Sequence, residues 1–127
     1  MNLSRVWWAL GVLLVGIAML VCLVPVTDVP RPLSWNDKLS HLAGHGAMAV
    51  YFAGLVPRRG WWKIFLLLLL MGISIEFAQH LMRVGREGDP RDVVANSAGA
   101  ALGLLAARLG LARWPELAAR LLGRAAQ

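Results

Sequence analysis

Long apolar runs with few or no charges alternate with short polar segments along this chain. The first run covers residues 6–26 without a charge, and a helix of that length spans about 30 Å, the thickness of a bilayer's hydrocarbon core. Three more runs follow at residues 39–56, 62–82 and 93–111. The pattern predicts an all-α membrane bundle of four transmembrane helices that forms one domain over residues 1–127. No A-x-A cleavage pattern follows the first run, so we expect that span to stay uncleaved.

Tryptophans and a short amphipathic segment indicate where the spans end. Six tryptophans lie at or beyond the predicted span ends, as aromatic residues do at membrane interfaces. In the tail, residues 112–127, Leu117, Leu121 and Leu122 share one side of a helical pattern. We expect this short amphipathic C-terminal helix to lie along the cytoplasmic membrane surface. The alternative is a frayed, solvated tail.

The last predicted span carries a row of small residues at every fourth position. They are Ala95, Gly99, Gly103 and Ala107. Such a row lets the backbones of two membrane helices approach closely, so we interpret it as a packing surface.

The distribution of charge predicts an orientation. The formal net charge is +6, but the basic residues flank the apolar spans, which favours a topological explanation over nucleic-acid binding. With a cytoplasmic N-terminus, eight Lys and Arg side chains lie in the cytoplasm and five lie outside. The eight are Arg5, Arg58, Arg59, Lys63, Arg108, Arg113, Arg120 and Arg124. We therefore predict that both termini are cytoplasmic, and that the bilayer, rather than nucleic acid, is the partner.

Most of the remaining polar residues are expected at the extracytoplasmic end of the bundle. His41 and His45 are four residues apart and share a helix face, as do Glu76 and His80. An ionisable group inside a membrane costs about 2.5–3.5 kcal/mol on insertion scales and usually faces a cavity. This cost favours a functional pocket over chance. The simpler alternatives are ion pairs that hold helices together and neutral histidines that only pack.

Three groups of polar residues carry a resemblance to a known family. They are Asp37-Lys38-x-x-His41, Glu76-x-x-Gln79 and Arg86-x-x-Asp89-x-x-Asp92-x-x-x-Asn96-x-x-Gly99. Their order and spacing resemble the VanZ-like family of bacterial membrane proteins, whereas His45 and His80 lie outside the family pattern. The resemblance implies a multi-pass helical domain in the bacterial inner membrane. Because the founding member of the family is associated with teicoplanin resistance, the resemblance also implies a link to glycopeptide resistance.

The first functional hypothesis is an outward-facing site for an anionic cell-envelope lipid or its headgroup. Lys38 and Arg86 would contact the phosphate, while Asp89 and Asp92 would orient the arginine or bridge to the phosphate through a divalent cation. The candidate binding residues are Asp37, Lys38, Gln79, Arg86, Asp89, Asp92 and Asn96. If the protein is an enzyme, Glu76 is the candidate general base and His41 the candidate acid or base.

Two alternatives belong to other functional classes. The protein could be a non-catalytic structural or accessory component of the cell envelope, whose polar cluster only locks helices. It could also be a metal-binding membrane enzyme that uses His41, His45, Glu76 and His80. The sequence contains no Gly-rich nucleotide loop, nucleophile elbow or cysteine pair. It identifies no cofactor and leaves open whether the protein is an enzyme.

Overall fold

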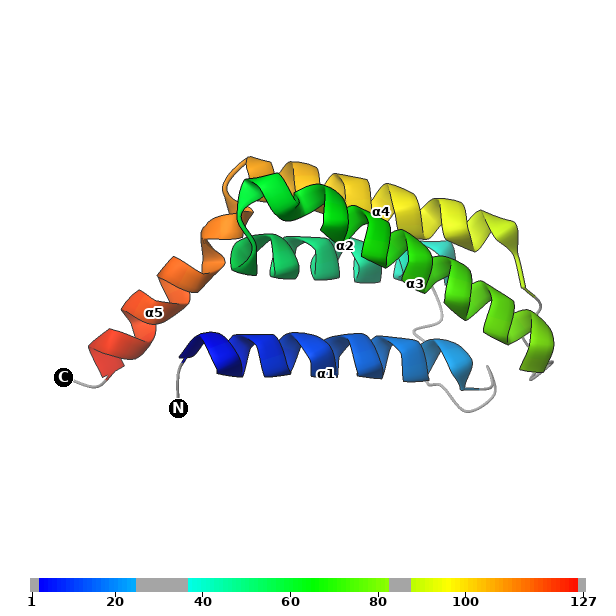
Figure 1. Cartoon of the computed structure of the whole chain (residues 1–127), viewed down its shortest axis with the longest axis horizontal. Coiled ribbons are helices and arrows are strands. Elements are labelled where there is room, and N and C mark those ends of the chain that lie inside the picture. Colours follow the sequence, from blue (N-terminus) through cyan, green and yellow to red (C-terminus); the bar gives the residue numbers. More distant parts are fainter. Residues whose placement is uncertain (1–2, 25–36, 83–87, 126–127) are drawn as a thin grey trace.

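The computed structural model of the chain describes residues 3–24, 37–82 and 88–125, and each regular element among them is a helix (Figure 1). The prediction of an all-α fold is therefore confirmed. The α-helices are α1 (Leu3–Leu23), α2 (Asp37–Leu55), α3 (Trp61–Met82), α4 (Pro90–Arg108) and α5 (Trp114–Ala125). Two 3-10 turns, η2 (Arg58–Gly60) and η3 (Leu111–Arg113), precede α3 and α5.

The start of α4 differs from the prediction. We expected the fourth span to begin at residue 93, but α4 begins at Pro90 because Asp89 caps it. The Asp89 carboxylate accepts a hydrogen bond from the Arg91 backbone N–H at 2.9 Å, and proline suits the first helical position, where no N–H donor is required. Arg91 and Asp92, which we expected in a loop, therefore lie in the first turn of α4.

The other end of α4 also differs from the predicted span. The helix ends at Arg108 rather than at residue 111, because Gly110 adopts a φ of 130° that residues with a side chain rarely adopt. The chain then turns through η3 into α5, and the two helical segments meet at an angle of 72°. The tail that we expected to contain a short amphipathic helix does form one, α5.

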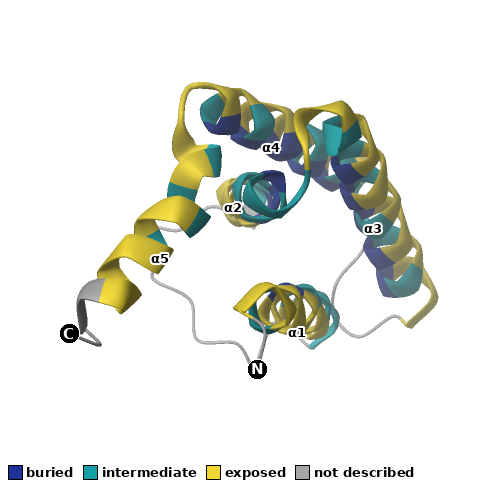
Figure 2. Ribbon diagram, turned by 60° about the vertical axis from the view of Figure 1, so that its left-hand side comes forward, coloured by how far each residue is buried: buried dark blue, intermediate teal, exposed yellow. Residues whose placement is uncertain are grey.

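Helices α1 to α4 run side by side, and α2 lies in the middle (Figures 1 and 2). Consecutive helices run in opposite directions, so α2 and α4 are parallel to each other and begin at the same end. The apolar core lies between α2, α3 and α4. It includes Met48 and Ala49 of α2, Leu68 of α3 and Ala100 of α4.

The row of small residues on α4 is a packing surface, as predicted. A Cβ atom on Gly99 would collide with the backbone carbonyl of Leu42, and one on Gly103 would lie 2.8 Å from the Ala49 Cβ. The α2 and α4 backbones therefore approach each other too closely for any larger residue at these two positions. This contact fixes the register of the two helices that carry most of the candidate site.

The outer surface of the bundle is apolar, as expected for contact with lipid chains. Val12 and Leu13 of α1 are 67% and 57% exposed, and Leu67 of α3 is 65% exposed. A soluble protein rarely leaves so many large apolar side chains together on its surface.

Two helical segments are long and apolar enough to cross a membrane, namely α1 and the segment Arg58–Met82 that contains α3. The bent pair of α4 and α5 would be a third if it counts as one span. Helix α2 is less apolar because its core-facing positions include histidine, glycine and alanine rather than leucine. The described part of the chain therefore has two to three candidate spans by length and composition, and the predicted number of four is not confirmed.

Aromatic side chains fix the start of α5 against the bundle. The Trp114 ring stacks on Tyr51 with a centroid distance of 4.8 Å, and its indole N–H donates a hydrogen bond to the Tyr51 carbonyl at 3.1 Å. Trp7 of α1 meets the same indole edge-on at 5.1 Å. We call this end of the bundle the basic end because it also carries Arg58, Arg59, Lys63, Arg108 and Arg113. The opposite end, with Lys38, His41, Glu76, Asp89 and Asp92, is the polar end.

Candidate functional site

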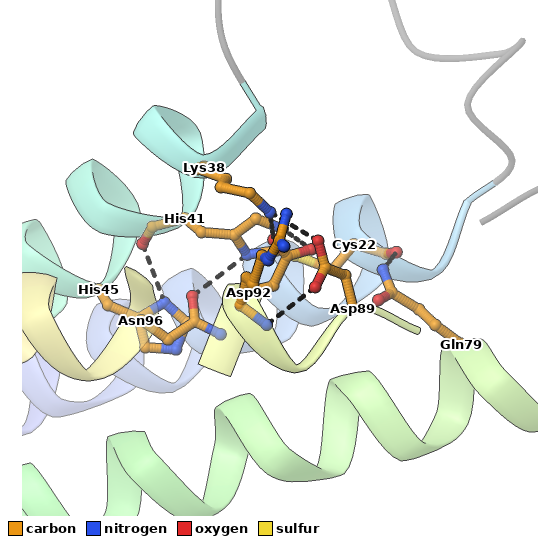
Figure 3. A network of polar contacts seen from close by, with 9 residues as sticks. Cys22, Lys38, His41, His45, Gln79, Asp89, Asp92 and Asn96 are labelled. Atoms are coloured by element: carbon orange, nitrogen blue, oxygen red, sulfur yellow. Dashed lines mark hydrogen bonds and ion pairs between the residues drawn. The ribbon is translucent and has the colours of Figure 1, made fainter. Parts of the chain in front are cut away.

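Two matched rows of polar residues face each other at the polar end. Lys38, His41 and His45 follow one another on α2 at intervals of three and four residues, and Asp89, Asp92 and Asn96 have the same intervals at the start of α4. Both spacings place their members on one face of a helix. Because α2 and α4 are parallel and begin together, the two rows meet (Figure 3).

Lys38 lies between two carboxylates at the surface of the polar end. Its Nζ atom donates hydrogen bonds to Asp89 Oδ2 at 2.8 Å and to Asp92 Oδ1 at 2.9 Å. The Lys38 and Asp89 side chains are 42% and 40% exposed, whereas Asp92 is 10% exposed. The ion pairs therefore join the two helices and remain partly exposed at the polar end.

The ion pair with Lys38 also changes the pKa of the Asp89 carboxyl. The Lys38 ammonium holds the pKa of Asp89 below its ordinary value, and the backbone N–H of Arg91 acts in the same direction. Asp89 is therefore ionised at neutral pH and can serve as the helix cap and as an ion-pair partner together.

His41 lies beneath the ion pairs and is buried. Its Nδ1 atom lies 3.1 Å from Asn96 Oδ1, and its Nε2 atom lies 3.5 Å from Asp92 Oδ2. Both neighbours present oxygen atoms. The ring therefore satisfies both of them when it carries two protons, or when the Asn96 amide is turned so that its NH2 group faces the ring.

His45 lies one turn deeper, also buried, and continues the polar row into the core. Its Nδ1–H donates a hydrogen bond to the His41 carbonyl, with a nitrogen–oxygen distance of 3.2 Å. Its Nε2 atom is buried and has no hydrogen-bond partner among the described residues. His45 thus packs inside the bundle with its Nδ1 atom engaged by a backbone carbonyl.

Glu76 on α3 is the second group at this end with an unsatisfied atom. Its Oε1 atom is buried and has no hydrogen-bond partner within the described part of the chain. Gly88 lies directly over it, because a Cβ atom on this glycine would come within 2.8 Å of Oε1. The carboxylate lines a hollow of about 320 Å³, together with the exposed side chain of His80 and the apolar residues Ile73, Phe77, Pro90 and Val93.

Gln79 connects the end of α3 to the end of α1. Its amide group donates a hydrogen bond to the Cys22 carbonyl at 2.7 Å, and the residue is 2% exposed. In this position the Gln79 amide ties the two helices together, and its role in binding a ligand stays a prediction.

Two of the predicted binding residues lie outside what the structure describes. Residues 83–87, which include Arg86, are not described, and neither is the side chain of Asp37. Their contribution to the site stays a prediction. Of the other predicted residues, Lys38, His41, Asp89, Asp92 and Asn96 come together in one network, and Glu76 interacts electrostatically with Lys38, Asp89 and Asp92.

The described residues contain no group of three His, Cys, Asp or Glu side chains that could hold a metal ion. His80 is exposed in the hollow beside Glu76, whereas the Nδ1 of His45 is engaged with a backbone carbonyl inside the core. The geometry of the described residues therefore gives the metal hypothesis no support.

A comparison with protein families identifies the chain. The model of the VanZ/LLP1 family matches residues 4–112. The chain belongs to the VanZ/LLP1 family. Family membership and the apolar helices α1 and α3 together make it a membrane protein. The match contains the whole polar network of this VanZ/LLP1 protein and ends before α5. No curated protein and no solved structure matches the chain.

Two glycines belong to the site, although the sequence pattern did not single them out. A Cβ atom on Gly72 would lie 2.8 Å from Asn96 Nδ2, and Gly88 covers Glu76. Gly72 lies four residues before Glu76 and interrupts the apolar run over residues 64–75. That interruption was the available signal, because a helix has little reason to carry glycine unless another group approaches it closely.

Proposed function

We propose that this VanZ/LLP1 protein crosses the bacterial inner membrane four times and binds an anionic cell-envelope lipid by its headgroup at the polar end. In this proposal the polar end is extracytoplasmic and both termini are cytoplasmic. The observation that carries it is the network of Lys38, Asp89, Asp92, His41 and Asn96 beside a buried Glu76 oxygen that has no partner among the described residues.

The lengths and neighbours of α2 and α4 support four spans. Each has 19 residues and is therefore about 28 Å long, close to the thickness of the hydrocarbon core. Both lie alongside α1 and α3, and their small residues face each other instead of lipid. A low average hydrophobicity is therefore compatible with a membrane position.

The unsatisfied Glu76 oxygen indicates what kind of headgroup would fit. A buried acceptor without a partner costs about 1–3 kcal/mol, and a hydroxyl or amino group of a ligand would remove that cost by donating a hydrogen bond. Helix packing alone gives no reason to keep this cost. We therefore expect a headgroup that carries both a phosphate and a hydrogen-bond donor.

The phosphate requires more positive charge than the described residues supply. Glu76, Asp89 and Asp92 carry three negative charges at this end, and only Lys38 and Arg91 oppose them. We assign the additional charge to Arg86, because the guanidinium group of an arginine can form a bidentate contact with a phosphate. A divalent cation on the exposed Asp89 carboxylate is the alternative source. If the bound lipid is also turned over, Glu76 is placed to act as a general base and His41 as a proton donor or acceptor.

Native mass spectrometry of the protein in mild detergent, with added phosphatidylglycerol as the probe, tests this proposal. We expect the wild type to retain the lipid and Arg86→Ala and Lys38→Gln to lose it. Arg91→Gln is the matched control, because its exposed side chain sits at the same end while only its backbone N–H joins the network. Equal retention by all four proteins would contradict the proposal.

A specific observation also favours the accessory function. The same ion pairs tie α2 to α4, which is what a scaffold without a ligand would need. In that case Lys38→Gln lowers the melting temperature and no variant changes lipid retention. The link to glycopeptide resistance stays a prediction of the family resemblance, and unchanged teicoplanin susceptibility on expression would contradict it.

A further inference from the structure

A second hollow lies between α1 and α3, over part of α2, and extends from the basic end to about the middle of the bundle. It has a volume of about 540 Å³, which is within the range of roughly 300–1,000 Å³ for small-molecule sites. Its lining is almost wholly apolar and includes Val15 and Met19 of α1 and Leu67, Leu70 and Met71 of α3. Among the described residues, Lys63 is the only ionisable side chain that lines it.

The hollow exists because α1 is fixed near its two ends and packs loosely elsewhere. At the basic end, Tyr51 donates a hydrogen bond to the Trp7 carbonyl at 2.7 Å, and at the polar end Gln79 bonds to Cys22. Gly11 is the only buried residue of α1. The part of α1 that faces α3 therefore leaves apolar surface uncovered, including the side chains of Val15 and Met19 that line the hollow.

The length of the hollow matches one leaflet of a bilayer. Lys63 and Ser74 line its two ends along α3, and eleven residues of helix rise about 16 Å. Half of a hydrocarbon core about 30 Å thick is about 15 Å. An acyl chain that enters beside Lys63 would therefore end near Ser74.

The position of Lys63 supplies the charge that a phospholipid needs. Its ammonium lies 5.6 Å from the centre of the Trp62 ring at the basic end, where a lysine extends its charge to the headgroup level and its stem lies along apolar surface. The Lys63 ammonium would attract a lipid phosphate at this level, as single basic residues near a membrane surface attract anionic lipids.

The hollow is separate from the proposed headgroup site. Leu67, Leu70 and Ser74 lie on one face of α3, whereas Ile73, Phe77 and His80 line the Glu76 hollow on another face. At 100° per residue the centres of these two sets lie roughly 90° apart around the helix. Because Lys63 lies at the basic end and Glu76 at the polar end, the two headgroups would lie in opposite leaflets.

We infer that the hollow between α1 and α3 binds one acyl chain of a phospholipid from the leaflet at the basic end, with the lipid phosphate at Lys63. The occupant is a glycerophospholipid, and α1 holds it against α3. This inference does not depend on the headgroup site, because it uses neither Arg86 nor Glu76.

Native mass spectrometry with phosphatidylglycerol tests the inference through a pair of matched substitutions. Leu67→Trp fills the hollow, and Leu102→Trp adds the same side chain to an exposed position of α4 that does not line it. We expect the first to lower occupancy by about tenfold, the effect of about 1.4 kcal/mol, and the second to leave it unchanged. Lys63→Gln should lower the lipid occupancy about fivefold. Leu70→Trp repeats the test if Leu67→Trp fails to fold.

Several outcomes would overturn the inference. Equal occupancy in the two tryptophan variants would show that the hollow does not hold the lipid. A dimer that disappears in Leu67→Trp would identify a second copy of the chain as the occupant. Arg86→Ala should leave this lipid bound, so one remaining adduct in that variant separates this site from failure of the headgroup proposal.

Discussion

At the scale of residues, matched spacing on two helices brings the polar side chains together at the polar end. Intervals of three and four residues on α2 and α4 bring Lys38 to Asp89 and Asp92, and His41 to Asn96. The sequence predicted which of these residues gather, because the spacing and the family resemblance are both visible in it. It could not predict that Gln79 turns to Cys22 or that Gly88 covers Glu76, because these contacts depend on how the helices are placed in space.

The ion pair of Asp89 leads to a dependence of stability on pH. The folded pKa of Asp89 lies below the ordinary value of about 3.8, so folding is stabilised above that value, and the stabilisation is lost as the pH falls through the folded pKa. Asp89→Asn keeps an acceptor for the helix cap but removes the charge. We expect its melting temperature to be lower than that of the wild type at pH 7. The difference should close at pH values below about 3.8; a difference that is independent of pH would contradict the role of the ion pair.

At the scale of elements, the contact between α2 and α4 determines how the two polar rows align. The small residues of α4 predicted a close helix contact, and Gly99 and Gly103 make that contact with the backbone and side chains of α2. The ends of the elements were harder to predict. Asp89 as a cap and Gly110 at positive φ shifted α4 by about three residues relative to the apolar run, because capping geometry rather than hydrophobicity decides where a helix begins and ends.

Two glycine-to-alanine substitutions, one at the contact and one away from it, test this packing. Gly99→Ala would place a methyl group against the Leu42 carbonyl, and this backbone atom cannot move without shifting α2. We expect a loss of about 1–3 kcal/mol of stability, as for overpacking in other tightly packed cores. Gly44→Ala is the control, because its Cβ would meet nothing within 4 Å. Similar melting temperatures for the two variants, measured in detergent, would contradict the packing account.

At the scale of the whole molecule, the helices separate two chemically different ends. The basic end gathers arginines, a lysine and the aromatic contacts of Trp114, and the polar end gathers the carboxylates and His41. The start of α1 and the whole of α5 lie at the basic end (Figure 1). The positive-inside bias, which is a property of the sequence alone, predicts that this end is cytoplasmic.

Reporter fusions at the C-terminus measure this orientation. We expect a fused green fluorescent protein to be fluorescent and a fused alkaline phosphatase to be inactive, because the first requires the cytoplasm and the second the periplasm. Replacing Arg58 and Arg59 with glutamine should weaken this preference, whereas replacing Arg91 should not. An active phosphatase fusion to the wild type would place the polar end in the cytoplasm and exclude an extracytoplasmic headgroup site.

The central claim is that the polar end is a binding site and not only a connection between helices, and Glu76→Gln tests it most directly. The Oε1 atom of this carboxylate is buried and has no partner among the described residues, so its charge is held there without a hydrogen bond at that atom. Glutamine should therefore leave the melting temperature unchanged or raise it. In the same samples, we expect native mass spectrometry to show that the headgroup-site phosphatidylglycerol adduct is lost. A lowered melting temperature with full retention of that adduct would contradict the account and leave Glu76 a structural residue.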